Sequence, residues 1–292
     1  MTGRIAVGLD GSAESLAAAH WAAREALLHG VPLDLVHSEE WSSSRDISPV
    51  TSAEMRSQWA ASLLRDTADE LRERHPGLDV ATRSLDERPA ASLAAVAASA
   101  DMLVLGSRGL GTLAGFVLGS VGMAVIHMTE RPVVLVRAGE DAGAHAQGSH
   151  RHREVLVGVD TDTPCDALLA FAFEEASRRS CTLRAVHSWT LPPLAGYGAA
   201  YDPRVHAQLD LSARAALDDV LKPWRAAYPT VDVAAHTAVG RAAGQLLESG
   251  SEAGLIVVGR RIRRSSLGAH IGPVTHAVLH HAKAPVAVIA HA

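Results

Sequence analysis

Short apolar runs alternate with longer segments of helical periodicity along the first half of the chain. The apolar runs cover residues 5–9, 102–105 and 132–136, and two further, more polar segments at 33–37 and 78–85 are also expected to be strands. Between them, apolar residues recur every three or four positions, which predicts helices over 12–29 and 52–74 and two more that begin at about Pro89 and Gly119. Strands that alternate with helices form a parallel sheet covered on both faces, so the pattern predicts an α/β domain of five strands.

Two of the predicted helices carry an apolar stripe that is expected to face the core. In the helix over 12–29, the stripe consists of Leu16, His20, Ala23 and Leu27. In the helix over 52–74, it consists of Met55, Trp59, Leu63, Leu64 and Leu71. Residues three or four positions apart lie on the same side of a helix, so we expect both stripes to pack against the sheet.

The second half of the chain repeats the first. The segment IAVGLDGS at 5–12 returns as VLVGVDTD at 155–162, which places Asp160 at the position of Asp10 with an offset of 150 residues. Later features return at an offset of 153, as when Pro132 corresponds to Pro285. The larger offset indicates a net insertion of three residues, which we assign to the loop at 189–203, rich in proline and glycine.

The repeat predicts two copies of one domain. We expect the first domain at 1–138, a small polar linker at 139–152, and the second domain at 153–292. Each domain is expected to be a five-stranded, parallel, Rossmann-like α/β unit.

Composition narrows the class of protein. Hydrophobic residues make up 48% of the 292 positions, and the formal net charge of −5 argues against a general nucleic-acid binder. No apolar run approaches the length of about 20 residues that spans a membrane, and Asp10 interrupts the N-terminal run too early for a signal peptide. Cys165 and Cys181 form no CxxC motif, so we expect a soluble protein of the cytoplasm.

The segment 101–136 carries the candidate chemistry. Its first apolar run ends in Gly106, Gly109 follows, and Gly119 and Ser120 open the next helix. Glycine lets a backbone approach a ligand closely, and a helix N-terminus attracts anions through its unpaired N–H groups and its dipole. The spacing is compatible with a phosphate site, although a plain glycine-rich loop has the same pattern.

A family resemblance favours the phosphate site. The spacing Gly106-x2-Gly109-x9-Gly119-Ser120 is similar to the ATP-binding signature of universal stress protein domains, as are the flanking segments ADMLVLGSRG, LGSVGMAV and RPVVLVR. The resemblance implies an adenine nucleotide alpha hydrolase-like fold with strand order 3-2-1-4-5. It also implies that the final strands, 132–137 and 285–290, pair the two halves.

The resemblance further implies site residues in the first domain. They are Gly8 and Asp10 near the base and ribose, Val36 beside the adenine, Gly106 and Gly109 near the ribose and phosphate, and Gly119, Ser120 and Val121 at the phosphates. Without the resemblance, Asp10 would be an ordinary turn carboxylate and Val36 an ordinary core residue.

The second domain departs from the signature. The corresponding site residues are Gly158, Asp160, Val186, Gly259, Gly272 and Val274. Ile262 stands where Gly109 is expected, and Pro273, which has no N–H, replaces Ser120. The arginines at 260, 261, 263 and 264 either hold phosphates by charge or form a solvated basic loop. We expect weaker or altered nucleotide binding in this half.

No metal site and no catalytic residue is expected. His276 and His280 have the i,i+4 spacing of a zinc pair on a helix, but a complete site needs three or four ligands. Cys165 and Cys181 are interpreted as packing residues.

The resemblance implies an ATP-binding regulator of stress or dormancy that takes ATP with or without Mg²⁺. Such a protein would form a homodimer and act on a protein partner that the sequence does not identify. Two alternatives stay open, a slow ATP-hydrolysing enzyme that uses the same site and an interaction scaffold in which nucleotide binding is vestigial.

Overall fold

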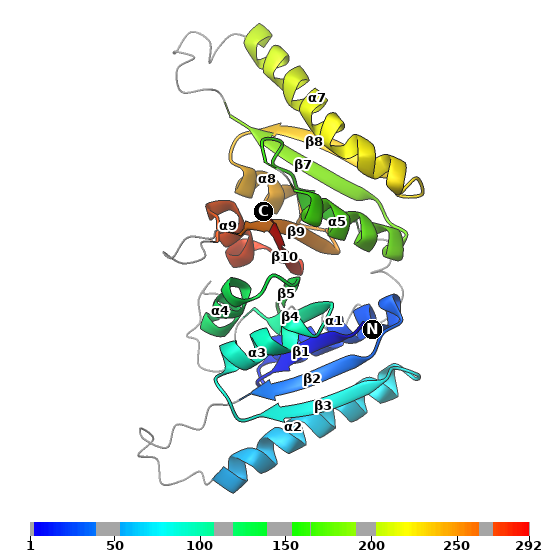
Figure 1. The fold of residues 1–292 in the computed structure, drawn as a ribbon. Coiled ribbons are helices and arrows are strands. Elements are labelled where there is room, and N and C mark those ends of the chain that lie inside the picture. The colour runs from blue at the N-terminus through cyan, green and yellow to red at the C-terminus, as the bar shows by residue number, and fades with distance from the viewer. Residues whose placement is uncertain are drawn as a thin grey trace. The chain divides into compact units, whose positions relative to one another are not determined.

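The computed structural model describes residues 3–38, 53–107, 119–138, 154–163, 165–190, 203–262 and 271–291. The chain divides into two compact units, Met1–Ala144 and His145–Ala292. Each unit alternates strands and helices, as Figure 1 shows along the colour gradient.

The first unit is a parallel sheet with helices on both faces. Its elements are β1 (Ile5–Leu9), α1 (Ala13–His29), β2 (Leu33–Ser38), α2 (Ala53–Arg74), β3 (Val80–Leu85), α3 (Pro89–Ala98), β4 (Met102–Gly106), α4 (Ser120–Met128) and β5 (Val133–Val136). The strand order is β3-β2-β1-β4-β5, and every pairing within the unit is parallel. The predicted fold class and strand order are confirmed.

The direction of the crossovers determines which face each helix covers. The chain moves one way across the sheet from β1 to β3 and the other way from β4 to β5. Right-handed crossovers therefore place α1 and α2 on one face and α3 and α4 on the other. In agreement, α1 contacts α2, and α3 contacts α4.

The second unit repeats this architecture. Its elements are β6 (Val155–Gly158), α5 (Asp166–Arg179), β7 (Leu183–Trp189), α7 (Pro203–Ala227), β8 (Val233–Val239), α8 (Ala242–Ser249), β9 (Leu255–Arg261), α9 (Pro273–His281) and β10 (Val286–His291). The strand order within the unit is β10-β9-β6-β7-β8, again with parallel pairing. The tandem five-stranded fold predicted from the repeat is confirmed.

The predicted apolar stripes of α1 and α2 were partly wrong. Leu27 is 45% exposed, because the buried face of α1 is built from small residues, Ala18, Ala19, Ala22 and Ala26 among them. In α2, Leu64 and Leu71 are buried, but Met55 is 53% and Trp59 45% exposed. Successive helical residues are turned by about 100°, so Trp59 points well away from the buried Ala60 next to it.

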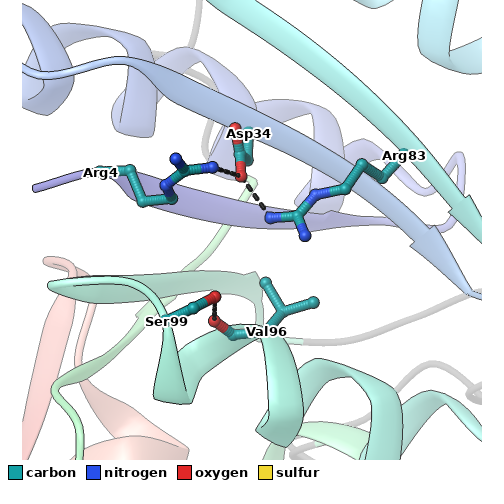
Figure 2. A network of polar contacts seen from close by, with 5 residues as sticks. All are labelled: Arg4, Asp34, Arg83, Val96 and Ser99. Carbon is teal, nitrogen blue, oxygen red and sulfur yellow. Dashed lines mark hydrogen bonds and ion pairs between the residues drawn. The ribbon is translucent and has the colours of Figure 1, made fainter. Parts of the chain in front are cut away.

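A buried carboxylate ties three neighbouring strands of the first unit together. The Asp34 side chain in β2 is 2% exposed, and its Oδ2 accepts a hydrogen bond of 3.0 Å from Arg4 Nη1 and a second one from Arg83 Nη2. Figure 2 shows both guanidinium groups directed at this oxygen from the strands on either side. Nearby, Ser99 Oγ donates to the carbonyl of Val96 at 2.9 Å and closes the end of α3 (Figure 2).

The second unit has the same pair with its charges exchanged. Arg184 stands where the repeat places Asp34, and Glu154 stands where it places Arg4. Arg184 Nε donates to Glu154 Oε2 at 3.0 Å. The ion pair between the first two strands is thus present in both units, with opposite polarity.

No helix among the described residues is long and apolar enough to cross a membrane.

Candidate functional site

Asp10 and Gly106, two of the predicted site residues of the first unit, lie at the carboxyl ends of β1 and β4. These strands are parallel neighbours in which Val7 lies opposite Val104. Asp10 follows the end of β1, and Gly106 is the last residue of β4. The chain leaves these two strands toward opposite faces of the sheet, and in such folds ligands bind at this edge.

The turn after β1 is held by hydrogen bonds around Asp10. Asp10 Oδ1 accepts from Ser12 N at 3.0 Å and from Ser12 Oγ at 2.6 Å. Ser12 Oγ also accepts from Ser15 N at 3.1 Å and caps α1. Gly11 between them has φ = 81°, a conformation that glycine adopts at little cost. The carboxylate is therefore fixed at the strand end by the start of α1.

Gly106 allows α1 to approach β4 closely. A Cβ atom at this position would lie 2.8 Å from Glu14 C and 2.8 Å from Ser15 N, both of them backbone atoms. Only a residue without a side chain permits this contact. The first glycine of the signature therefore has a packing role, which places the Asp10 turn beside the end of β4.

The N-terminus of α4 carries groups that attract an anion. Gly119 is the N-cap in extended conformation and makes no side-chain capping bond, while its N–H donates to Ser107 O at 3.0 Å. The N–H groups of a helix's first turn have no partner within the helix. Ser120 and Val121, which lie in that turn, are exposed. Backbone donors, a hydroxyl group and the helix dipole all favour negative charge here.

Two further predicted residues lie within the sheet, and one lies outside the described residues. Val36 is fully buried in β2, directly opposite Gly8 in β1. A Cβ atom at Gly8 would lie 2.6 Å from Leu105 Cδ2, so this glycine also serves strand and side-chain packing. Gly109 falls outside the described residues.

His37 and Trp59 also line this region, although the sequence pattern assigned neither of them a functional role. His37 ends up beside the Asp10 turn, where its Nδ1 lies 2.8 Å from Leu9 O. The Trp59 ring meets the His37 ring edge-on, with centroids 5.5 Å apart at 78°. The sequence does show that a histidine recurs at 37 and 187, at equivalent positions of the two repeats. Nothing in the sequence indicates that Trp59 of α2 contacts His37.

The second unit places its counterparts at the same edge with a different turn. Gly158 ends β6 and lies opposite Val186 in β7. Asp160 accepts from Asp162 N at 3.1 Å and from Thr163 Oγ1 at 2.8 Å. The helix that follows begins only at Asp166 and has no side-chain cap. The carboxylate is thus held by an exposed turn instead of a capped helix.

The segment of the second unit that corresponds to the glycine signature also has different contacts around Gly259 and Gly272. Gly272 is the N-cap of α9, Pro273 is its first residue, and Val274 follows in the same turn. Thr275 Oγ1 donates to the carbonyl of Gly259 at 2.7 Å. A Cβ atom at Gly259 would lie 2.6 Å from His291 Nε2, so a histidine side chain of β10 takes the room that the backbone of α1 fills in the first unit.

The predicted arginine cluster is only partly within the described residues. Arg260 is 4% exposed, whereas Arg261 at the end of β9 is exposed. Residues 263 and 264 fall outside the described part of the chain. A solvated loop therefore does not describe Arg260, which lies inside the unit.

The remaining sequence candidates are the histidine pair of α9 and the two cysteines. His276 and His280 lie side by side on α9 with ring centroids 4.3 Å apart and ring planes tilted by 36°. Cys165 is buried, and desolvation together with the charges of Asp166 and Asp160 raises the pKa of its thiol to about 11. Burial likewise raises the pKa of Cys181.

Comparison with known proteins decides the family. Residues 1–137 and 152–290 each match the Universal stress protein family. The chain belongs to the universal stress protein family. The two matches place a family domain in each half, so this is a tandem universal stress protein.

Its relatives include proteins of similar length. A universal stress protein of Mycolicibacterium smegmatis is 36% identical over 306 residues, which covers 98% of this chain and 96% of the relative. A universal stress protein of Mycobacterium tuberculosis is 32% identical over 294 residues, which covers 97% of this chain and 96% of the relative. Among solved structures, a universal stress protein from Archaeoglobus fulgidus has a TM-score of 0.69 over 100% of both chains at 18% identity, a likeness of fold.

Proposed function

We propose that the first unit of this universal stress protein binds ATP, together with Mg²⁺, at the carboxyl edge of its sheet. The observation that carries the proposal is the uncapped N-terminus of α4 beside the ends of β1 and β4. Its first-turn N–H groups and the Ser120 hydroxyl would hold the phosphates. Gly119, Val121, Gly106 and Gly109 complete the phosphate side of the proposed site.

Asp10 would bind the ribose. Carboxylates at the end of a neighbouring strand accept hydrogen bonds from ribose hydroxyl groups in dinucleotide-binding folds. The bonds from Ser12 keep the Asp10 carboxylate in place before a ligand arrives. Gly8 and Val36 would act as the floor on the base side, because both lie in the sheet directly below this edge.

The second unit is proposed to bind nucleotide more weakly. Pro273 removes one backbone donor and the hydroxyl group at the start of α9. The exposed turn at Asp160 and the contact of His291 with Gly259 change the other side of the site. If nucleotide enters, Gly158, Asp160, Val186, Gly259, Gly272 and Val274 would contact it.

Isothermal titration of the full chain with ATP and Mg²⁺ tests the proposal. We expect one tight site per chain. The variant Ser120→Pro copies the second unit, because proline fits the first turn of a helix but has no N–H. It should weaken ATP binding by at least about tenfold, since a hydrogen bond to a charged group contributes about 1.5–3 kcal/mol. Ser120→Ala, which keeps the N–H, is the matched control and should lose less.

Three results would count against the proposal. Absence of binding by the wild-type chain would overturn it and leave the scaffold function. Equal affinity at two sites would contradict the weaker second unit. Release of ADP and phosphate that stops in Ser120→Pro would replace the regulator with an enzyme.

The biological role is proposed on the basis of the family. The chain would act in the cytoplasm as a homodimer that regulates the response to stress or dormancy, with ATP selecting the conformation that its protein partner binds. Light scattering with and without ATP tests both the dimer and its dependence on nucleotide. A molar mass of one chain at all concentrations would contradict this part.

A further inference from the structure

Trp59 covers the turn that carries Asp10. A Cβ atom at Gly11 would lie 2.8 Å from Trp59 Cζ2 and 3.2 Å from Cη2, so the six-membered ring of the indole rests directly on the Gly11 backbone. The side chain comes from the second turn of α2 and reaches the turn after β1. It thereby joins the proposed site from an element that carries none of the signature residues.

The indole is fixed on one side and open on the other. Its ring contacts His37 edge-on, and His37 is in turn held at Leu9 O, so the two rings form a wall over the ends of β1 and β2. His37 is 5% exposed, whereas Trp59 is 45% exposed. A large aromatic side chain with one face supported and nearly half its surface in water offers a platform on which another flat ring can stack.

The position of this wall matches the base end of the proposed ligand. The phosphate donors are at the start of α4, next to β4, and β1 separates β4 from β2. A nucleotide with its phosphates at α4 and its ribose at Asp10 must therefore extend its base toward β2. The wall of Trp59 and His37 stands at the ends of β1 and β2, where that base would arrive.

The second unit has neither the tryptophan nor the glycine of the contact between Trp59 and Gly11. Aligned by their buried positions, Ala60 and Leu64 of α2 correspond to Ala213 and Leu217 of α7, which puts Ser212 at the position of Trp59. The Ser212 hydroxyl donates to Gln208 O at 3.0 Å within its own helix. Thr161 stands where Gly11 would be, and a residue with a Cβ could not accept the indole at that distance.

We propose that Trp59 is a specificity-determining residue of the first unit, against which the aromatic base of the nucleotide stacks. This inference rests on the proposed nucleotide site. The wall makes binding in the first unit depend on the base as well as on the phosphates. A ligand with the same phosphate chain but no base would not use it.

The experiment compares two probes, ATP and inorganic tripolyphosphate, both with Mg²⁺, on the full chain. Stacking of a base on an aromatic side chain contributes about 1–3 kcal/mol, so Trp59→Ala should weaken ATP binding roughly 5- to 150-fold. Binding of tripolyphosphate should stay unchanged. Trp59→Phe should retain most of the ATP affinity, because a phenyl ring still provides a stacking face. Met55→Ala, one turn earlier on the exposed side of α2, is the matched control and should bind both probes as the wild type does.

Fluorescence gives a second readout. The chain has five tryptophans, and the difference between the wild type and Trp59→Phe isolates the emission of this one. ATP should quench the isolated signal, and tripolyphosphate should not.

The outcomes separate this inference from the function on which it rests. If Trp59→Ala weakens both probes alike, the indole only supports the Asp10 turn and the inference is overturned. It is also overturned if ATP affinity does not change, and in both cases the nucleotide site stands. If the wild type binds tripolyphosphate as tightly as ATP, the site recognises the phosphates and not the base, and the inference about Trp59 is overturned. If it binds neither, both proposals fail.

Discussion

The buried Asp34 carboxylate permits a prediction in which the same contacts are removed from either side with different results. One route removes the charge of the acid with Asp34→Asn. The other replaces both bases by methionine, in the double variant Arg4→Met and Arg83→Met, which keeps the aliphatic length of the side chains. Both routes end the ion pairs that Figure 2 shows.

The magnitudes follow from the exposure of the partners. The Asp34 side chain is 2% exposed, whereas Arg4 and Arg83 are each 38% exposed. Without its arginines, the carboxylate stays buried without the two contacts that compensate its charge, which costs about 3–5 kcal/mol of unfolding free energy. With asparagine at 34, the arginines regain hydration at their exposed side and the amide oxygen still accepts hydrogen bonds. The cost should then be about 1–2 kcal/mol.

Hydrogen exchange followed by mass spectrometry is the suitable assay, because it reports on each unit separately within the full chain. Protection in β1, β2 and β3 should fall more in the double methionine variant than in Asp34→Asn. Protection of the second unit should not change in either. Its reversed pair of Glu154 and Arg184 provides a parallel experiment, in which Glu154→Gln should cost less than about 1.5 kcal/mol because both side chains reach solvent.

A result in which Asp34→Asn costs as much as the double variant, or more, would refute the reasoning. The network would then stabilise the unit mainly by attraction between charges, and the desolvation of the carboxylate would be the smaller effect. A loss of protection that spreads equally to the second unit would also contradict it.

Three further predictions concern packing, pH and thiol chemistry. In denaturant titrations, Gly106→Ala should destabilise the first unit by more than about 1 kcal/mol, because the new Cβ atom would clash with the backbone of α1. Gly122→Ala should be neutral or stabilising, because its Cβ atom would make only an ordinary contact of 3.5 Å with Leu135. Desolvation lowers the pKa of His20 despite the nearby charge of Glu70, so the unfolded chain binds the proton more tightly than the folded chain. The free energy of unfolding should therefore fall as the pH drops below 6.5, the ordinary pKa of histidine. The variant His20→Gln should make this fall with pH less steep. Cys165, with a pKa of about 11, should react with a thiol reagent at pH 8 only slowly until the chain is unfolded.

Each of these has an opposing result. Equal stability of Gly106→Ala and Gly122→Ala would mean that α1 can retreat from β4 without cost. An acid slope unchanged in His20→Gln would assign the pH dependence to other groups, among them His75, whose pKa is also lowered by burial. Rapid labelling of Cys165 in the folded chain would indicate frequent local opening at the start of α5.

Much of the fold followed from short stretches of sequence. The apolar runs predicted β1, β4 and β5 nearly to their ends, because a strand buried on both faces must be apolar throughout. Of the signature glycines, Gly106 marked the end of β4 and Gly119 the start of α4. The repeat then predicted the second unit, although it did not reveal that Thr275 and His291 rearrange the surroundings of Gly259.

The sequence by itself determined most elements, their order, the tandem repeat and the helix start at Gly119, because these depend on neighbouring residues and on fixed spacings. Only the tertiary structure decided which side chains meet. Asp34 lies 30 residues from Arg4 and 49 from Arg83, and strand order alone brings them together. Trp59 belonged to an apolar stripe by its spacing, but the rotation of α2 about its own axis turned it out of the core and onto Gly11. Helix rotation is determined by packing against the whole sheet, which no local pattern encodes.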